Sequence, residues 1–337
     1  MAESMKVVEI RDRFGIDHLT LGERPVPQPG DGEVLVRLKA ASLNFRDFDV
    51  VGGARAVSLP LIPVSDGAGE VVAVGRNVTT VAVGDRVCPL YVQGWIGGDL
   101  PAQDVVPTLG GPLDGVLRDY GVWPESGVVR FPDFLTDAEA ATLPCAAVSA
   151  WNAVMAAGRC TPGSVVVLQG TGGVSLFALQ FAKAAGATVI LTSGSDEKLE
   201  RGRALGADHG INYRTTPDWG AAVKRLTGTG ADLVVDIGGV GTLGQSAAAL
   251  RNGGRISAVG FVGSLSGELN IGPFLMKGLR LRFIRVGNRT HFEAMAKAIA
   301  QHRLRPVVDR VFPFAEIRDA FRHLQAAGHF GKVCIGF

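Results

Sequence analysis

The sequence predicts an α/β protein with an antiparallel, barrel-like β domain followed by a doubly wound domain around a parallel sheet. Its 337 residues exceed the roughly 100 to 200 that one domain usually takes. Up to about residue 130, short β-branched runs such as 33–39 and 69–75 are separated by Gly, Pro and Asp, as is typical of antiparallel strands and turns. Further along, helical stretches alternate with uniformly apolar runs such as 165–168 and 188–191, which indicates βαβ units with strands buried on both faces.

The C-terminal part continues this alternation and then departs from it. Residues 233–236 and 255–259 are predicted as further buried strands, and residues 279–286 as the last strand of the parallel sheet. Two helical patterns follow, at 291–301 and 315–327. We expect the C-terminal tail to return to the first domain.

Composition excludes several classes of function. Lys and Arg number 34 against 32 Asp and Glu, and the resulting net charge of +2 argues against a nucleic-acid or membrane-surface partner. The four cysteines are too far apart for a CxxC pair or a disulfide framework, which favours a reducing compartment. No run approaches the roughly 18 apolar residues of a membrane helix, and the N-terminus lacks an apolar signal segment. We therefore expect a soluble, unprocessed, cytoplasmic protein.

A glycine-rich turn between a strand and a helix is the strongest chemical signal. Backbone N–H groups and the positive end of the helix at such a turn bind pyrophosphate. Gly170 and Gly172 match the first two positions of the G-x-G-x-x-G dinucleotide fingerprint, whereas the third position is Ser175. An ordinary turn is the alternative, but the flanking strand and helix favour dinucleotide binding. The expected contacts are Gly170, Thr171, Gly172, Gly173 and Val174.

The end of the next strand indicates which dinucleotide binds. NAD-dependent enzymes place an acidic residue about 20 residues after the first glycine. Here hydroxyl groups, among them Ser193, occupy that stretch and Lys198 follows. A missing acid and an available cation favour a 2′-phosphate, so we expect NADP(H). The alternative role of Ser195 is a helix N-cap, and that of Lys198 is a solvated residue on the helix surface. NAD is the alternative cofactor, because Asp196 is an acidic residue in the same stretch.

Motifs along the whole chain identify a family. Together with the glycine turn they are highly specific, and they cover residues 30–36, 44–47, 84–87, 143–151, 204–208, 253–256 and 329–333. With these motifs the chain resembles the medium-chain dehydrogenases/reductases, and within them the zinc-free, quinone-oxidoreductase-like branch. The resemblance implies a GroES-like β-barrel catalytic domain at residues 1–128 and 288–337. It also implies a Rossmann cofactor-binding domain at residues 129–287.

The resemblance also bears on metal binding. Zinc-dependent relatives hold catalytic zinc with a Cys, a His and a second Cys, and the matching positions here are Asn44, Ser65 and Cys145. Catalytic zinc needs three protein ligands and a water, so one thiol does not suffice. The loop that matches the structural zinc lobe, residues 91–120, contains no cysteine. We therefore predict neither a catalytic nor a structural zinc ion, and we expect Cys145 to be a small buried residue.

The resemblance assigns roles to further residues. Asn44 is the candidate catalytic residue as an amide donor to the substrate, and a turn-stabilising role is its alternative. Arg46 and Asp47 are expected to pair and brace the same loop. Ser149, Val286 and Gly287 are implied near the nicotinamide, and Lys332 near the pyrophosphate. The full set of implied cofactor contacts outside the glycine turn is Ser149, Ser193, Lys198, Tyr213, Gly238, Gly260, Phe261, Val286, Gly287 and Lys332.

Without a Lewis acid, acceptors that need little activation are favoured. Hydride transfer from NADPH to a quinone or an α,β-unsaturated carbonyl builds charge on an oxygen that hydrogen-bond donors can hold. We therefore predict a zinc-free, NADP-dependent oxidoreductase of such small molecules. A metal-free alcohol dehydrogenase or carbonyl reductase is the second hypothesis. A cofactor-binding structural or RNA-associating protein with little activity is the third.

The predicted last strand also suggests an assembly. Residues 279–286 end the parallel sheet, and an exposed strand edge invites pairing with a second copy. The family resemblance likewise implies dimers joined along that edge. We expect a homodimer.

Overall fold

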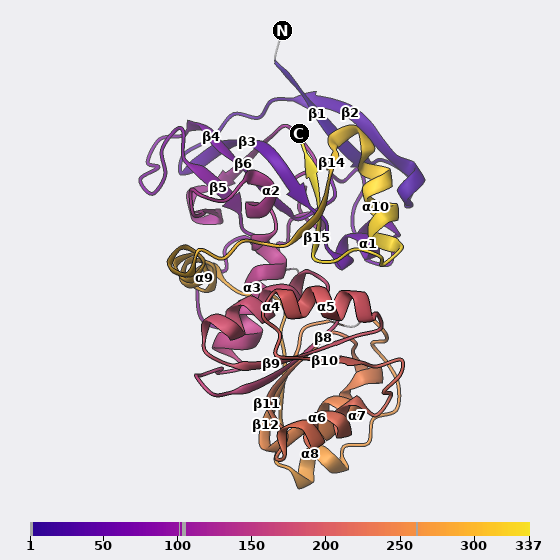
Figure 1. The fold of residues 1–337 in the computed structure, drawn as a ribbon. Coiled ribbons are helices and arrows are strands. Elements are labelled where there is room, and N and C mark those ends of the chain that lie inside the picture. The colour runs from indigo at the N-terminus through magenta and orange to yellow at the C-terminus, as the bar shows by residue number, and fades with distance from the viewer. Residues whose placement is uncertain (1–2, 101, 103–105, 261) are drawn as a thin grey trace. The chain divides into compact units, whose positions relative to one another are not determined.

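The computed structural model describes residues 3–100, 102, 106–260 and 262–337. The chain divides into two units (Figure 1). Unit 1 contains the chain up to Cys145 together with Asn288–Phe337, and unit 2 contains Ala146–Gly287. The first boundary, expected after residue 128, falls at 145 because the intervening segment packs onto the strands of unit 1. Arg86 Nη2 donates to Asp137 Oδ1 at 2.6 Å, and the Cys88 thiol donates to the Ala140 carbonyl at 3.3 Å.

Unit 1 is a mostly antiparallel, barrel-like β structure, as predicted. One sheet has the order β14-β15-β3-β4-β5-β7, β6 pairs with β3, and β1 pairs separately with β2. The strands are β1 (Ser4–Ile10), β2 (Leu19–Pro25), β3 (Glu33–Ser42), β4 (Asp66–Val74), β5 (Arg86–Pro89), β6 (Tyr120–Pro124), β7 (Val128–Arg130), β14 (Val308–Pro313) and β15 (Lys332–Gly336). The helices are α1 (Phe45–Val51), α2 (Asp137–Ala140), α9 (Arg289–His302) and α10 (Ile317–Gln325).

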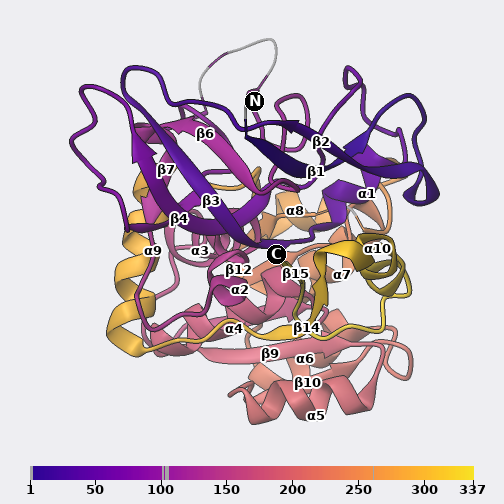
Figure 2. The ribbon, with the colours of Figure 1, turned by 90° about the horizontal axis from the view of Figure 1, so that it is seen from above.

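The C-terminal tail returns to the first part of the chain, as expected. Strand β15 pairs antiparallel with β3, with Cys334 opposite Ser42, and β14 pairs parallel with β15. Figure 2 shows these yellow C-terminal strands within the same unit as the indigo and violet strands. Buried side chains of both ends, such as Val36, Leu38, Val333 and Ile335, share one core cluster. Burying them removes apolar surface from water, which holds the two ends of the chain together.

Unit 2 is a doubly wound Rossmann-type sheet. All six strands are parallel and their order is β10-β9-β8-β11-β12-β13. The strands are β8 (Val165–Gln169), β9 (Thr188–Ser193), β10 (His209–Asn212), β11 (Ala231–Asp236), β12 (Leu250–Ala258) and β13 (Arg280–Phe283). The helices are α3 (Val148–Trp151), α4 (Gly173–Ala184), α5 (Asp196–Ala204), α6 (Trp219–Thr227), α7 (Val240–Ala249) and α8 (Gly272–Met276).

The strand order of unit 2 locates its binding edge. Figure 1 shows α4 and α5 on one face of the sheet and α6 and α7 on the other. The winding direction therefore reverses between β8 and β11, and an open α/β sheet binds ligands at the carboxyl ends of its strands at such a point. No helix in the described ranges is both long enough and apolar enough to span a bilayer.

Candidate functional site

The turn between β8 and α4 has the geometry of an anion-binding site. Gly170 has a φ of 74°, a left-handed conformation that favours glycine, and Gly172 is the extended N-cap residue of α4. No side chain in the described chain caps this helix. A Cβ built on Gly172 would meet no atom within 4 Å, so the space in front of the helix N-terminus is open. Free N–H groups and the helix dipole thus face a space that a phosphate group can enter.

Ser175 stands where the dinucleotide fingerprint has its third glycine, and its hydroxyl has a buried partner. It donates to the Gln169 carbonyl at the end of β8, at 2.6 Å, and the residue is 1% exposed. A buried hydroxyl that has its hydrogen bond carries little desolvation cost. Close packing of α4 against β8 therefore tolerates serine here.

A buried carboxyl group that no sequence motif marks fixes the neighbouring loop after β11. Asp236 Oδ1 accepts the backbone N–H of Gly238 at 3.0 Å and the Thr242 hydroxyl at 2.7 Å. Its Oδ2 accepts from Gln169 Nε2 at 2.8 Å and from the Ser246 hydroxyl. Asp236 is fully buried, so these donors stabilise a charge that would otherwise be costly. The network ties the loop that begins at Gly238 to the end of β8.

The end of β9 gathers hydroxyl and basic groups. Ser195 caps α5 by accepting the Lys198 N–H at 3.3 Å, so the capping role considered for it is observed. A Cβ on Gly194 would lie 2.8 Å from the Tyr213 hydroxyl and 2.9 Å from Arg214 Nε. Tyr213, from the segment after β10, therefore comes to the end of β9. Arg214 does so as well, although it belongs to none of the sequence motifs.

The remaining sites implied in unit 2 lie at several strand and helix ends. Ser149 is buried in α3, and Gly260 follows β12. The Val286 carbonyl accepts from Asn152 Nδ2 at 2.7 Å, directly before Gly287 at the end of unit 2. The predicted contact Phe261 lies outside the described residues.

In unit 1, the half-buried Asn44 and the buried Lys332 form a pair although 288 positions separate them. Asn44 is the N-cap residue of α1, and Lys332 begins β15. Lys332 Nζ donates to Asn44 Oδ1 at 2.6 Å and also to the Leu43 carbonyl. Because an ammonium group can only donate, the Asn44 amide must turn its oxygen toward Lys332 and its NH₂ group away. Lys332 is only 4% exposed, so its described contacts fix it within the protein.

The Asn44–Lys332 pair continues into Ser65, Asp66 and Cys145, and these five residues are called the polar cluster below. Asn44 Nδ2 faces Ser65 Oγ at 3.5 Å, and Ser65 Oγ donates to Asp66 Oδ1 at 2.6 Å. Asp66 Oδ2 accepts the Cys145 N–H at 3.0 Å. Burial raises the pKa of Asp66, while the Lys332 ammonium opposes that rise. Asp66 was not identified from the sequence.

Strained backbone lies directly before Ser65. Val64 has a φ of 70°, a left-handed conformation that a β-branched residue rarely adopts. The Val64 carbonyl accepts the Val116 N–H at 2.8 Å, which holds the strained residue in place. Such strain is maintained only where surrounding contacts over-determine the backbone, and it concentrates at functional sites.

Arg46 and Asp47 brace the loop that carries Asn44, as predicted. Asp47 Oδ2 accepts the Asn44 N–H at 2.8 Å, and Arg46 Nη1 lies 3.4 Å from Asp47 Oδ1. Arg46 also donates to the carbonyls of Leu109 and Gly111. Burial raises the pKa of Asp47 to about 6, against the opposing effect of Arg46.

The fold and the glycine turn together define the architecture of dinucleotide-dependent oxidoreductases, and family models match both units. Residues 30–133 match the alcohol dehydrogenase GroES-like domain, and residues 173–301 match the zinc-binding dehydrogenase domain. A zinc-type alcohol dehydrogenase-like protein of Schizosaccharomyces pombe is 43% identical, over 95% of this chain and 96% of that protein. The chain belongs to the medium-chain dehydrogenase/reductase family, and it is an oxidoreductase.

Solved structures include relatives with two kinds of name. An NAD-dependent alcohol dehydrogenase is 34% identical with a TM-score of 0.92, covering 98% of this chain and 99% of that one. A quinone oxidoreductase from Coxiella burnetii is 26% identical with a TM-score of 0.80, covering 99% of this chain and all of that one.

Because one matching family model is named for zinc binding, the polar cluster has to be compared with a zinc site. Asn44 and Ser65 offer only neutral oxygen or nitrogen atoms, and the Lys332 ammonium lies beside them. Cys145 is half-buried rather than buried as expected, and desolvation together with Asp66 raises the pKa of its thiol well above the ordinary range. Cys145 offers a single thiol, whereas catalytic zinc needs three protein ligands. In the described chain no three His, Cys, Asp or Glu side chains are grouped to hold a metal. These residues do not fit catalytic zinc.

Proposed function

We propose that the protein uses NADPH to reduce quinones or α,β-unsaturated carbonyl compounds without a metal ion. The observation that carries this proposal is the Asn44–Lys332 pair. Where zinc-dependent relatives place a metal ligand, this chain presents an amide whose orientation is set by a buried ammonium group. An oriented donor suits acceptors whose oxygen gains charge during reduction.

The polar cluster stabilises negative charge on the substrate oxygen in this proposal. Asn44 Nδ2 carries two hydrogens, of which one is directed to Ser65 and the other serves the substrate. Ser65 donates its own hydrogen to Asp66, so its oxygen is free to accept from Asn44. Lys332 does not touch the substrate and acts as a positioning residue that also contributes positive charge. A donor oriented beforehand needs no reorganisation when charge develops.

Apart from Lys332, which lies in unit 1, the proposed cofactor residues belong to unit 2. NADPH, when bound, supplies the hydride. The open N-terminus of α4 at Gly172 fits a pyrophosphate group, with Gly170, Thr171, Gly173 and Val174 around it. Ser149, Gly238, Gly260, Val286, Gly287 and Lys332 remain proposed contacts.

The end of β9 supports NADPH over NADH. Ser193, Lys198, Tyr213 and Arg214 bring hydroxyl and basic groups to this part of unit 2. Asp196, the acidic residue that favours NAD, accepts a hydrogen bond from Asn212 Nδ2 at 2.8 Å, so one of its oxygens is already engaged. A relative named as NAD-dependent keeps NADH as the alternative.

The cofactor preference is tested by comparing kcat/KM for NADPH and NADH in wild type and Lys198→Ala. A kcat/KM that falls in Lys198→Ala with NADPH but not with NADH supports the proposal. The proposal is contradicted if the wild type has the higher kcat/KM with NADH and Lys198→Ala leaves that value unchanged.

A metal-free alcohol dehydrogenase or carbonyl reductase is the second candidate. The names of two relatives favour it, since the 43% and the 34% identical proteins are both described as alcohol dehydrogenase types. The same polar cluster could donate to the oxygen of an aldehyde or ketone, so the two candidates differ in the acceptor rather than in the cofactor.

The deciding experiment measures NADPH oxidation with a quinone, an enone and an aldehyde side by side. We expect turnover of the quinone or the enone, and a loss of about ten- to a hundredfold in kcat for Asn44→Ala. Metal analysis of the same preparation should find substoichiometric zinc, and a chelator should leave turnover unchanged. Turnover of the aldehyde alone would favour the second candidate, and stoichiometric zinc that is required for turnover would reject both.

We also propose that the protein is a homodimer joined along β13. In the described residues this strand ends the sheet of unit 2 without a neighbour on its outer side. Large apolar side chains are exposed on it and on the nearby α8, where Phe283 is 73%, Leu275 78% and Met276 82% exposed. Apolar side chains beside an unpaired strand edge are a surface that a second copy can cover.

A further inference from the structure

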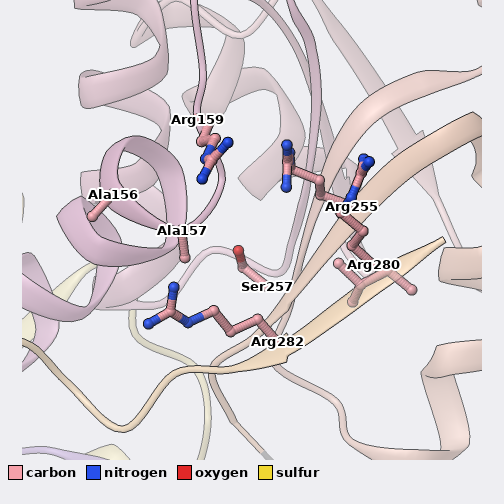
Figure 3. Close-up of a pocket in the computed structure, with 8 residues that line it drawn as sticks. Ala156, Ala157, Arg159, Arg255, Ser257, Arg280 and Arg282 are labelled. Atoms are coloured by element: carbon pink, nitrogen blue, oxygen red, sulfur yellow. The ribbon is translucent and has the colours of Figure 1, made fainter. Parts of the chain in front are cut away.

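Unit 2 contains a cavity lined by arginines on one face of its sheet. The cavity has a volume of about 180 Å³ and is lined by Ala156, Ala157, Arg159, Arg255, Ile256, Ser257, Arg280 and Arg282. Figure 3 shows the four arginines placed around Ser257. This volume is about six times the roughly 30 Å³ that one water molecule takes in the liquid, so the space can hold a small ligand.

The arginines converge because of the strand register. Arg255 in β12 is the register partner of Arg280 in β13, and Ser257 is that of Arg282. Side chains two apart on a strand share a face, so these four residues project from the same side of the sheet. Arg159 joins them from the turn after the π-helical segment η4 (Asn152–Ala156). It does so with a φ of 54°, a left-handed conformation that is unusual for a residue other than glycine.

Three of the four arginines at this cavity form no ion pair with a described carboxylate. In the described chain, no carboxylate lies within 4 Å of a charged nitrogen of Arg159, Arg255 or Arg280, whereas the nearby Arg251 pairs with Asp232 at 2.6 Å. Arg280 Nη1 donates to the Gly253 carbonyl at 3.0 Å, which anchors it without neutralising it. Desolvation and the positive charges of Arg280 and Arg159 lower the pKa of Arg255.

We propose that this cavity is an anion site that binds a phosphate or diphosphate group. Guanidinium groups match the oxygens of such groups in shape as well as charge, and a ligand with two or more negative charges offsets the repulsion among the arginines. Ser257 does not supply a donor, since its hydroxyl donates to the Ala153 carbonyl at 2.8 Å. Recognition therefore depends on the arginines. The small volume favours a small ligand over a nucleic acid strand, which needs an extended basic stripe.

Binding is tested with pyrophosphate, inorganic phosphate and a simple phosphate monoester, each by calorimetry at constant ionic strength. The variants are Arg255→Gln and, as a matched control on the exposed surface of α6, Arg225→Gln. We expect pyrophosphate to bind about tenfold or more weakly to Arg255→Gln than to wild type, and unchanged to Arg225→Gln. If the phosphate monoester binds more tightly than both inorganic anions, the ligand of the cavity is a phosphorylated metabolite rather than a free inorganic anion. Arg159→Gln provides a second variant if Arg255→Gln does not fold.

The glycine turn could also bind pyrophosphate, so Gly172→Ala is measured alongside. Retention of the tight binding in Gly172→Ala and its loss in Arg255→Gln assigns it to the arginine cavity. The reverse pattern, or binding no tighter than that of chloride at equal ionic strength, overturns the proposal. Light scattering of the same samples determines whether a second copy is present. If the wild type is dimeric and binds no pyrophosphate, a second copy covers the cavity and the anion-site proposal is rejected.

Discussion

Among single residues, Lys332 has the largest consequence for the chemistry proposed here. A lysine that is 4% exposed and donates to an amide oxygen is unusual, because burial disfavours an ammonium group unless nearby groups compensate it. Asp66 supplies part of that compensation. The interactions of Lys332, Asn44 and Asp66 are therefore coupled. Substitutions at these positions should have non-additive effects on the free energy of unfolding.

Replacing Lys332 with Met tests this dependence. The change removes the ammonium and leaves Asp66 as an uncompensated buried charge, which should cost about 3 to 5 kcal/mol in the free energy of unfolding. Adding Asp66→Asn should recover part of that loss, as measured by urea unfolding of the single and double variants. Lys332→Arg, which keeps the charge, should retain most of kcat with little change in KM. Additive losses of stability in the double variant would show that Lys332 and Asp66 do not interact.

Asp47 gives the folding equilibrium a predictable pH dependence. Its pKa is about 6 in the folded protein, above the value of about 4 of an exposed aspartate, so the unfolded chain loses this proton first. The contribution of Asp47 therefore makes the folded state less stable as pH rises from about 4 to 6, by up to about 3 kcal/mol. Urea unfolding of wild type and Asp47→Asn across this range should show the difference in slope. The exposed Asp133→Asn should keep the wild-type slope, and equal slopes for wild type and Asp47→Asn would refute the assignment.

At the level of secondary-structure elements, the local sequence predicted most strands and helices of both units correctly. The uniformly apolar runs predicted strands of the parallel sheet, and the strand, glycines and helix around Gly172 lie where the fingerprint puts them. The last strand is shorter than predicted, since β13 covers Arg280–Phe283 rather than residues 279–286. Apolar and β-branched composition indicates a strand but not its ends, because these are set by where hydrogen bonding to β12 stops.

Two glycines of the turn should respond differently to alanine. At Gly172 a Cβ meets no atom within 4 Å and φ is −81°, so Gly172→Ala should fold normally and bind NADPH about tenfold or more weakly. At Gly170 the φ of 74° strains any other residue, so Gly170→Ala should lose about 1 kcal/mol or more of stability. NADPH fluorescence titration and thermal unfolding separate the two effects. Gly244→Ala, on the exposed side of α7, is the control for cofactor binding. Unchanged affinity in Gly172→Ala would argue against pyrophosphate at this turn.

For the molecule as a whole, the proposed assembly depends on the outer edge of β13. A charged side chain there should prevent association, because burying an unpaired ammonium costs more than the apolar contact gives. Phe283→Lys should convert the dimer to a monomer at micromolar concentration in light scattering, while Leu226→Lys on α6, also an exposed apolar position, should remain dimeric. A monomeric wild type would remove this prediction.

The sequence by itself determined the class of fold, the order of strands and helices, the glycine turn and the family, because each depends on residues that are neighbours in the chain. Pairing Arg46 with Asp47 was predictable for the same reason. The tertiary structure decided which distant residues meet. The antiparallel register of β15 on β3 brings Lys332 to Asn44, and the parallel register of β12 and β13 brings Arg255 to Arg280. No local sequence pattern predicts these contacts, since the residues of one strand do not specify which distant strand will pair with it.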